Sequence, residues 1–499
     1  MKKVLLIKPK NDVVAQEIPL GLLHIGTVLN KEGYAVTIID AAKQPGYEEL
    51  ISKEIDDTLI VGITCLTSEV ASAIEISDYI KSISNVPVIW GGWHPTLFPE
   101  QVCCDKSVDF ACVGEGEYTI LELVKALEAD ASFANIGGLA YKDNGSVKVN
   151  PQKGYVNLEE LPPIDYGLID ISRYIRTLSN GERRIPYQSS RGCPHRCKFC
   201  INVVTGNQIY RVKSPEKVVN EIQILIDKFG VNYIVLVEDN FFVNITRSRG
   251  ILEEIIKSNL NIKWFAECRV DYFKPDMVNE SILDLAQRSG ADEFTIGAES
   301  GSQRVLDLID KGITVEQILT SAKILSGFNI TAGYSFMLGI PGETREEMVA
   351  TIKLAQKIYK LCPKGQIGFS IFTPYPKCEL SEILVEKGLF KQPETLREWT
   401  SDEVRELYYG RFRSKPWYED YKFMDNVIHY DRMAYNIYPY SGTKNWLRNI
   451  IKHPRKYRGM FLVLMAQMRM KHFFFAVPID RILFRVYIYL RNRWRLFFR

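Results

Sequence analysis

The chain has 499 residues, a length typical of about three domains. Its hydrophobic fraction of 46% and charged fraction of 25% exclude a disordered chain, a collagen and a small disulfide scaffold. The net charge of +3 hides an uneven distribution, because residues 451–499 hold 12 of the 63 Lys and Arg residues but one of the 60 acidic residues. The body of the chain is therefore mildly acidic and its end is strongly basic.

The first residues do not resemble an export signal. The apolar run at residues 4–7 is too short for a signal peptide, and no stretch reaches 18 uninterrupted apolar residues. Ten cysteines without an export signal indicate a reducing compartment, where cysteines are packed, catalytic or metal-binding. We therefore expect a cytoplasmic protein without a transmembrane helix.

Short apolar runs alternate with amphipathic stretches over residues 1–135. The expected strands are 4–7, 36–39, 59–65, 87–90 and 110–113, and the expected helices are 19–32, 47–55, 69–83 and 118–129. This pattern predicts an α/β domain with a doubly wound, Rossmann-like parallel sheet, whose ligands lie beyond the carboxyl ends of the strands. The loop at residues 8–17 lacks glycine, so an NAD or ATP site of the usual kind is not expected.

A linker and a second alternating region follow. Residues 136–184 are expected to form a linker with a hairpin around Asp143-Asn144-Gly145. Residues 185–390 contain expected strands at 233–237, 263–267, 294–298, 331–337 and 366–372. About six βα units predict a partial (β/α)6 barrel with its chemistry at the strand carboxyl ends. Residues 391–499 are expected to be an α-helical C-terminal region.

The most specific signal is a CxxxCxxC spacing of Cys193, Cys197 and Cys200. Thiolates this close together converge on a soft-metal centre, and iron–sulfur clusters are held by such ligands. Because a fourth cysteine does not lie nearby, a 4Fe–4S cluster here would keep one iron open for a small molecule. The alternatives are a zinc site that includes His195, or three reduced cysteines without metal. Zinc sites favour two CxxC pairs, which the chain lacks.

The cysteine spacing, with Phe199 before the last cysteine and ahead of a βα barrel, resembles the radical S-adenosylmethionine superfamily. The resemblance covers about residues 185–390 and implies that the three cysteines bind the cluster and are catalytic. It also implies that S-adenosylmethionine is bound at the barrel's strand ends by Phe199, Glu238, Asp239, Arg269, Glu299, Ser300, Gly339 and Pro374. Without the family, Glu238 and Asp239 could be helix N-caps. Lys377-Cys378 departs from the family's Gly-Thr at the adenine-side loop.

The amino-terminal region is similar to the cobalamin-binding domain that is fused to one subclass, the class B methyltransferases. This likeness implies that cobalamin is bound by Pro19, Gly21, Thr64, Gly91, Gly92, His94, Gly114, Glu115 and Gly116. The family's lower-ligand histidine is missing from residues 40–46, so we expect cobalt without that histidine or a domain that has lost cobalamin. His94 is a candidate substitute ligand, although a histidine beside a proline is more often a turn residue.

The resemblance implies a two-stage reaction. An external one-electron reductant reduces the cluster, S-adenosylmethionine is cleaved, and the 5′-deoxyadenosyl radical removes hydrogen from an unactivated carbon of a small-molecule or lipid-like substrate. Methylcobalamin then methylates the substrate radical, and a second S-adenosylmethionine remethylates the cobalt. The alternatives are an anaerobic oxidative cyclase or rearrangement enzyme resembling the magnesium-protoporphyrin ester cyclases, and a non-enzymatic electron-transfer or sensing protein.

Residues 452–499 interleave aromatic and basic side chains. Such stretches can bind nucleic acid or an anionic membrane surface, and the apolar run at 460–468 favours the membrane. We expect peripheral attachment at the inner face of the membrane, which would suit a lipid-like substrate, and no nucleic-acid partner. The alternative is a helical subdomain that packs on the barrel and exposes a basic face.

Overall fold

The computed structural model describes residues 2–11, 18–206, 208–409, 415–418, 421–431, 465–466 and 468–469. The chain divides into two compact units. Unit 1 comprises Met1–Ala266, Arg288–Gly290 and Thr373–Arg411, and unit 2 comprises Glu267–Gln287, Ala291–Phe372 and Phe412–Arg499. Most of residues 452–499 lies outside the described residues, so membrane attachment stays a prediction. Within the described part, the helices lack the length and hydrophobicity needed to cross a lipid bilayer.

The described part of unit 1 begins with a seven-stranded sheet in the order β2-β1-β3-β4-β5-β6-β7. Its strands are β1 (Lys3–Lys8), β2 (Ala35–Asp40), β3 (Thr58–Thr64), β4 (Val88–Gly91), β5 (Phe110–Cys112), β6 (Leu139–Asp143) and β7 (Ser146–Val149). The first five strands are parallel and their apolar runs are buried. The predicted Rossmann-like sheet is confirmed.

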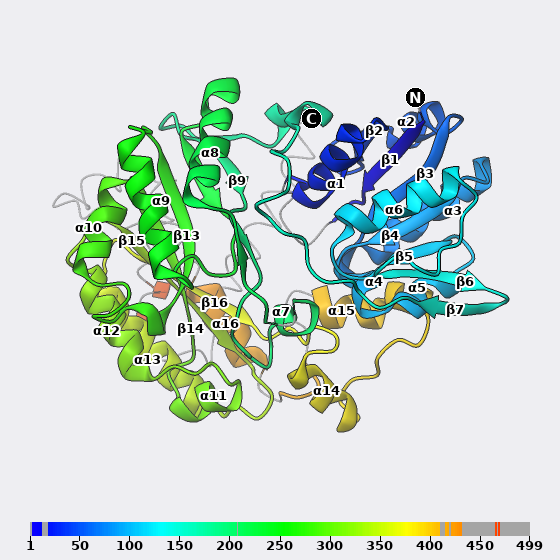
Figure 1. Ribbon diagram of the computed structural model, residues 1–499. Coiled ribbons are helices and arrows are strands. Elements are labelled where there is room, and N and C mark those ends of the chain that lie inside the picture. Colours follow the sequence, from blue (N-terminus) through cyan, green and yellow to red (C-terminus); the bar gives the residue numbers. More distant parts are fainter. Residues whose placement is uncertain are drawn as a thin grey trace, which may run out of the picture. The chain divides into compact units, whose positions relative to one another are not determined.

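Two pairs of helices cover this sheet (Figure 1). Helix α1 (Leu20–Lys31) packs on α6 (Gly116–Glu128), and α2 (Tyr47–Glu54) packs on α3 (Val70–Ile83). The connection from β1 to β2 runs in one direction across the sheet and the later parallel connections run in the other, so the two pairs lie on opposite faces. At this reversal the loops after β1 and β3 diverge, which is where such sheets bind ligands.

The hairpin expected in the linker belongs to the first sheet instead. Strand β6 pairs antiparallel with β5, and β7 pairs antiparallel with β6. Asn144 and Gly145 form the turn with φ of 48° and 83°. Leu139 and Ala140 are fully buried, so apolar contact with the sheet accounts for this placement. The turn signal predicted the hairpin but carried no information on its pairing partner.

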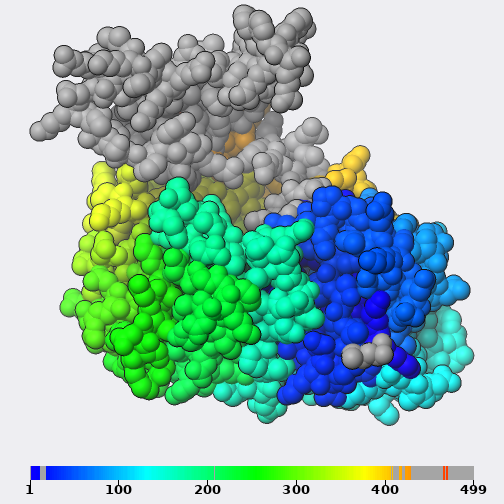
Figure 2. Space-filling model, turned by 90° about the horizontal axis from the view of Figure 1, so that it is seen from above, coloured from blue at the N-terminus to red at the C-terminus, as the bar shows by residue number. Residues whose placement is uncertain are grey.

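The barrel strands begin in unit 1. Strands β8 (Arg176–Thr177), β9 (Arg183–Tyr187), β12 (Tyr233–Leu236) and β13 (Lys263–Arg269) follow the order β13-β12-β9-β8. Strands β9, β12 and β13 are parallel, and α8 (Pro215–Phe229) and α9 (Ile245–Lys257) connect them. Figure 2 shows the amino-terminal part of unit 1, in blue, in contact with the blue-green residues that follow it in the sequence.

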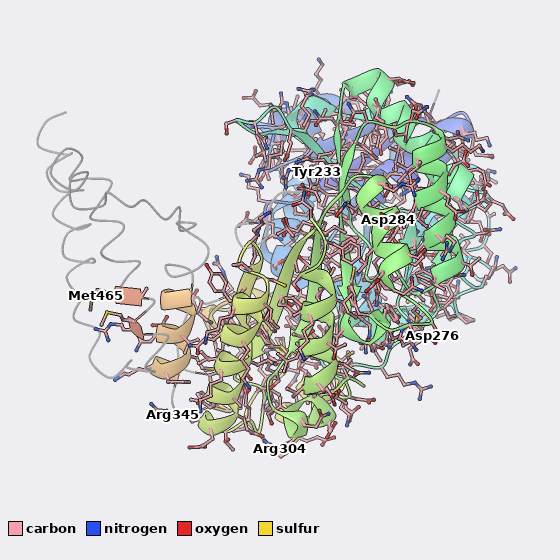
Figure 3. The ribbon with its side chains drawn as sticks, turned by 90° about the vertical axis from the view of Figure 1, so that its left-hand side faces the viewer. Tyr233, Asp276, Asp284, Arg304, Arg345 and Met465 are labelled. Atoms are coloured by element: carbon pink, nitrogen blue, oxygen red, sulfur yellow. The ribbon has the colours of Figure 1, made fainter. Side chains whose placement is uncertain are left out.

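The boundary between the units falls within β13, and unit 2 continues the alternation. Its strands are β14 (Ala291–Glu299), β15 (Thr331–Leu338) and β16 (Gln366–Ile371), which are parallel neighbours. Its helices are α10 (Glu280–Arg288), α11 (Gln303–Leu308), α12 (Val315–Leu325), α13 (Arg345–Leu361) and α16 (Tyr421–Asp431). Arg304 of α11 pairs with Glu347 of α13 at 2.5 Å, and Figure 3 shows Arg304 and Arg345 at this end of the helices. The predicted partial barrel is confirmed.

The segment after β16 returns to the first sheet of unit 1. It contains α14 (Glu379–Glu386), η5 (Leu396–Thr400) and α15 (Asp402–Tyr409). Arg397 pairs with Asp78 at 2.8 Å and with Asp105 at 2.7 Å. Trp399 donates a hydrogen bond to Gln101 at 2.9 Å. These contacts attach η5 to α3 and to α5 (Pro99–Cys104).

Candidate functional site

A cavity of about 420 Å³ lies in unit 1 at the carboxyl edge of the first sheet. Its lining includes seven of the residues predicted to bind cobalamin, namely Gly21, Thr64, Gly91, Gly92, Gly114, Glu115 and Gly116. Leu20, Leu22, Ile63 and Ile89 give the sheet side an apolar surface. Pro19 lies one residue ahead of the lining, at the start of α1. The strand ends therefore converge on one space, as the doubly wound sheet requires.

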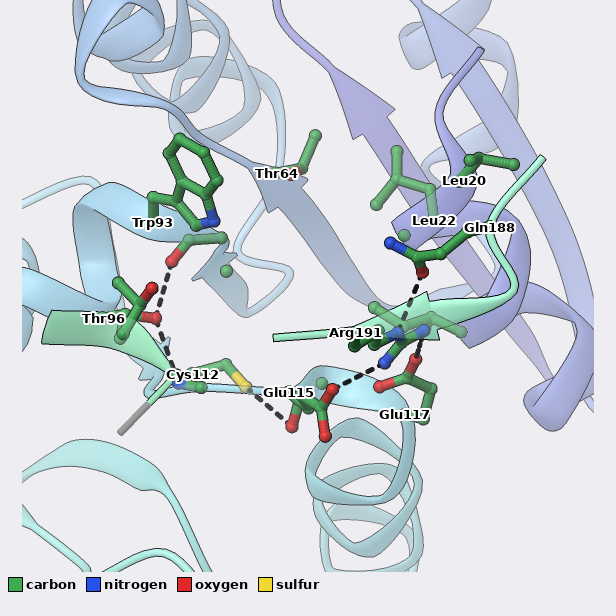
Figure 4. A pocket seen from close by; sticks show the side chains of 18 of the residues that line it. Leu20, Leu22, Thr64, Trp93, Thr96, Cys112, Glu115, Glu117, Gln188 and Arg191 are labelled. Carbon is green, nitrogen blue, oxygen red and sulfur yellow. Dashed lines mark hydrogen bonds and ion pairs between the residues drawn. The ribbon is translucent and has the colours of Figure 1, made fainter. Parts of the chain in front are cut away.

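Two glycine turns form part of the cavity wall. Gly92 has a φ of 97°, and a Cβ there would lie 3.0 Å from the Cys65 carbonyl oxygen, so the backbone conformation requires glycine. Thr96 Oγ1 donates to the Gly92 carbonyl at 2.7 Å and accepts from the Gly114 amide at 3.0 Å (Figure 4). Thr96 thus holds the two turns together, a role that the sequence motif did not reveal.

His94 does not line the cavity. Its ring is fully buried between Phe98 and Trp399, with centroid separations of 5.3 and 5.0 Å. Burial lowers the pKa of His94 to about 3, so the ring is neutral. His94 is therefore placed in the core, and its predicted role as a cobalt ligand finds no support in this position. Among the described residues that line the cavity there is no histidine, in agreement with the missing lower-ligand motif.

The loop that carries the three cysteines is closed at its base by a short ribbon. Strand β10 (Ser190–Arg191) pairs antiparallel with β11 (Arg211–Val212). Gly192 follows β10 with a φ of 84°, and a Cβ there would lie 2.0 Å from the Ile209 carbonyl oxygen. Only glycine can start this loop without moving the opposite strand. Gly192 and two residues of α7 (Ile201–Thr205), Asn202 and Thr205, line the same cavity as the glycine turns.

The cysteine thiols lie close enough to interact electrostatically. Burial raises the pKa of Cys200 to about 11, and Cys197, Asp239 and Cys193 add to the shift. Across the described residues, no three or more His, Cys, Asp or Glu side chains are placed to hold a single metal ion. Zinc would need its ligands around one point. In a 4Fe–4S cluster each thiolate binds a different iron, so the three thiols need not surround one point.

Two arginines of the ribbon hold it against the start of α6. Arg191 contacts Glu115 at 2.8 Å and Glu117 at 2.7 Å, and Arg211 contacts Glu115 at 2.7 Å. Figure 4 shows Arg191 between the two carboxylates. Burial alone would raise the pKa of Glu115, but its hydrogen bonds and charge interactions with Arg211 and Arg191 outweigh burial and lower the pKa. Glu115 therefore lines the cavity, while its carboxylate holds the two arginines.

The two acidic residues after β12, Glu238 and Asp239, have different surroundings. Glu238 is buried, accepts hydrogen bonds from Ser189 and, at 2.6 Å, from Ser190, and does not line the cavity. Asp239 lines the cavity and accepts a hydrogen bond from Asn202. Burial raises the pKa of Asp239. Asp239 is therefore the carboxylate of this pair that can reach a ligand.

The other residues predicted to bind S-adenosylmethionine lie mostly in unit 2, where Arg269 and Glu299 meet at Lys311. Arg269 donates to the Lys311 carbonyl at 2.5 Å, and Lys311 donates to Glu299 at 2.7 Å. Glu299 ends β14 with a φ of 58°, a conformation uncommon outside glycine. Ser300 is fully buried 3.2 Å from Thr351, so it supports the turn.

Gly339 ends β15 in a turn that is held from two sides. Its amide donates to Glu343 at 2.7 Å, and its carbonyl accepts from Trp417 at 2.9 Å. Burial raises the pKa of Glu343 to about 7, although hydrogen bonds from the Ile340 and Gly339 amides oppose this rise. The two remaining predicted residues, Phe199 and Pro374, lie in unit 1. Phe199 is half-buried, and the carbonyl of Pro374 accepts a hydrogen bond from Ser381 at 3.4 Å.

Comparison with known proteins identifies the two parts of the chain. Residues 187–355 match the radical SAM superfamily, and residues 4–124 match the B12 binding domain. The chain is 33% identical to an uncharacterized methyltransferase of Pyrococcus horikoshii, over 81% of this chain and 88% of that protein. It is 27% identical to the anaerobic magnesium-protoporphyrin IX monomethyl ester cyclase of Rubrivivax gelatinosus, over 77% and 70%.

A solved structure shows the same fold. The radical S-adenosylmethionine methyltransferase TsrM from Kitasatospora setae, with cobalamin and a [4Fe-4S] cluster bound, matches with a TM-score of 0.66 and 20% identity. The match covers 83% of this chain and 84% of that chain. The protein belongs to the radical SAM superfamily and carries a B12 binding domain ahead of the barrel. The resemblance read from the motifs is confirmed, and the protein is an enzyme of this superfamily.

The residues present fit the cofactors of this family. The cavity combines glycine turns that admit close approach of a large ligand with an apolar sheet side. Two buried polar atoms of its lining residues, Tyr155 Oη and Arg211 Nε, have no hydrogen-bond partner in the described structure. Next to the cavity, three thiols without a disulfide provide the soft ligands that iron prefers.

Replacement of Glu115 tests the contact between the ribbon and α6. Glu115→Gln removes the carboxylate that pairs with the half-buried Arg191 and Arg211. We therefore expect a loss of about 3–5 kcal/mol in the free energy of unfolding. Glu122→Gln, on the same helix, removes only an exposed pair with Lys153 at 3.1 Å and should cost less than about 1 kcal/mol. Urea unfolding measures both, and equal losses would contradict the assigned role.

The pH dependence of the same variant follows from the lowered pKa. A carboxyl whose pKa is lower in the folded state stabilises the fold above its unfolded pKa of about 4.3, and this contribution is lost as pH falls through the folded pKa. Between about pH 5 and pH 3 the wild type should therefore lose more stability than Glu115→Gln. Parallel stability curves for the two proteins would show that Glu115 is not linked to protonation.

Gly192→Ala tests the geometry of the cysteine loop. The added Cβ would meet the Ile209 carbonyl oxygen at 2.0 Å, so we expect the loop to shift and iron incorporation to fall. Gly145→Ala is a matched control, because Gly145 has nearly the same φ, 83° against 84°, and open space around it. Iron and sulfide per chain are measured after anaerobic reconstitution. Wild-type iron content in Gly192→Ala would refute the requirement for glycine.

Proposed function

We propose that this enzyme is a cobalamin-dependent methyltransferase that uses radical chemistry to methylate an unactivated carbon of a small molecule. One observation carries the proposal: the glycine turns of the B12 binding domain and the base of the cysteine loop line a single cavity. A cobalamin on the sheet side would therefore face the residues beside the cluster. The 33% identity with a methyltransferase supports methyl transfer.

The chain's residues divide the work as follows. Cys193, Cys197 and Cys200 hold the cluster, and the turns at Gly91-Gly92 and Gly114–Gly116 hold the corrin. In unit 1, Asp239 would contact S-adenosylmethionine, and the same role for Arg269, Glu299 and Gly339 of unit 2 stays a prediction. When bound, these groups supply a 5′-deoxyadenosyl radical for hydrogen abstraction and a methyl group for transfer. The buried walls orient the substrate and exclude water, which would otherwise compete for reactive species.

A second candidate is an anaerobic oxidative cyclase or rearrangement enzyme. The observation that favours it is the 27% identity with the magnesium-protoporphyrin ester cyclase over 77% of this chain. Both candidates need an external one-electron reductant and cleave S-adenosylmethionine. They differ in whether a methyl group is consumed.

The products of S-adenosylmethionine distinguish the two. We expect the reconstituted enzyme, incubated anaerobically with cobalamin and a one-electron reductant, to form 5′-deoxyadenosine and S-adenosylhomocysteine, quantified by chromatography. Formation of 5′-deoxyadenosine without S-adenosylhomocysteine would rule out methyl transfer and favour the cyclase reaction.

The control is a variant with Cys193, Cys197 and Cys200 replaced by alanine, matched by Cys104→Ala at an exposed cysteine outside the site. The triple variant should lose iron and 5′-deoxyadenosine formation, whereas Cys104→Ala should retain both. If the triple variant still formed 5′-deoxyadenosine, the cluster assignment would be wrong.

A further inference from the structure

Two hydrogen-bond donors at the cavity have no partner in the described structure. They are the hydroxyl of Tyr155 and the Nε–H of Arg211, both buried atoms of residues that line the cavity. Buried polar groups in folded proteins are nearly always satisfied, because an unmade hydrogen bond costs free energy. The pair therefore points to a ligand that accepts hydrogen bonds.

The two side chains are held in place without that ligand. The guanidinium carbon of Arg211 lies 4.7 Å from the centroid of the Tyr155 ring, within the range of a cation–π contact. Arg211 also donates to the Val156 carbonyl at 2.9 Å, and the Val156 amide donates to Glu115 at 2.8 Å. The donors are thus fixed by neighbouring contacts before a ligand arrives, which lowers the entropy cost of binding.

The charged residues of the cavity lining indicate which class of hydrogen-bond acceptor a ligand would offer here. Arg191 and Arg211 are the basic residues in the described lining, and Glu115 and Glu117 neutralise them. Asp239 adds a further acidic residue to the lining. A phosphate or carboxylate would therefore meet no excess positive charge. A neutral carbonyl oxygen can accept a hydrogen bond here without this penalty.

We propose that Tyr155 and Arg211 form an amide-binding subsite that positions the corrin through amide side chains at its edge. This inference rests on the proposed function, since it takes cobalamin as the ligand. Cobalamin offers two sources of acceptor oxygen, the amides of the corrin ring and the phosphate of the nucleotide loop. The lack of excess positive charge in the lining favours the amides.

Tyr155→Phe tests the subsite, because it removes one oxygen and keeps the ring beneath Arg211. Tyr118→Phe is the matched control, since Tyr118 lies on α6, is 42% exposed and does not line the cavity. The full-length proteins are titrated with aquacobalamin and with aquacobinamide, which lacks the nucleotide loop. Absorption changes give Kd, and thermal unfolding of the apoproteins gives Tm.

We expect Tyr155→Phe to raise Kd about two- to tenfold for both corrinoids, the range for loss of one hydrogen bond. The Tm of the apoprotein should stay unchanged or rise, because the lost hydroxyl has no partner there. Tyr118→Phe should change neither quantity.

Three results would overturn the inference. Unchanged Kd values for Tyr155→Phe would show that the hydroxyl does not bind the cofactor. An effect on cobalamin alone would move the contact to the nucleotide loop, and a lowered Tm without a change in Kd would reveal a structural role. If the wild type bound neither corrinoid, the proposed function itself would fail as well.

Discussion

The structure depends on a charge cluster that couples two parts of unit 1. Arg191 and Arg211, on opposite strands of the ribbon, share the carboxylate of Glu115, and Arg191 also binds Glu117. The cysteine loop begins one residue after Arg191, and the second glycine turn ends where α6 begins. Because the pairs are mostly shielded from water, separating them would leave poorly solvated charges. The cluster thus fixes the cavity wall on which both cofactor assignments rest.

Backbone conformation sets the rest of the cavity. Gly92 and Gly192 adopt positive φ values where a side chain would collide with a neighbouring carbonyl, and Thr96 joins the two turns of the sheet. The described lining offers no histidine, and Leu20, Leu22, Ile63 and Ile89 give its sheet side an apolar surface.

The alternation of strands and helices could be predicted from the sequence because it depends on local periodicity. Helix α8 is an example, since Ser214 caps it, Pro215 starts it and Gly230 ends it. The contacts of Thr96 with Gly114 and of Arg211 with Glu115 could not be predicted, because the partners are distant in sequence. The pairing of the Asn144 hairpin with β5 and the separate roles of Glu238 and Asp239 depend likewise on tertiary packing.

The central claim is that cobalamin and the cluster occupy one continuous site. Electron paramagnetic resonance of enzyme loaded with cob(II)alamin and a reduced cluster tests it directly, since two nearby paramagnets relax each other. If the two cofactors share one site, the cob(II)alamin signal relaxes faster when the cluster is reduced, and this change is lost when the cluster cysteines are replaced. If the relaxation rate of the cob(II)alamin signal did not change with the redox state of the cluster, the two cofactors would not share one site.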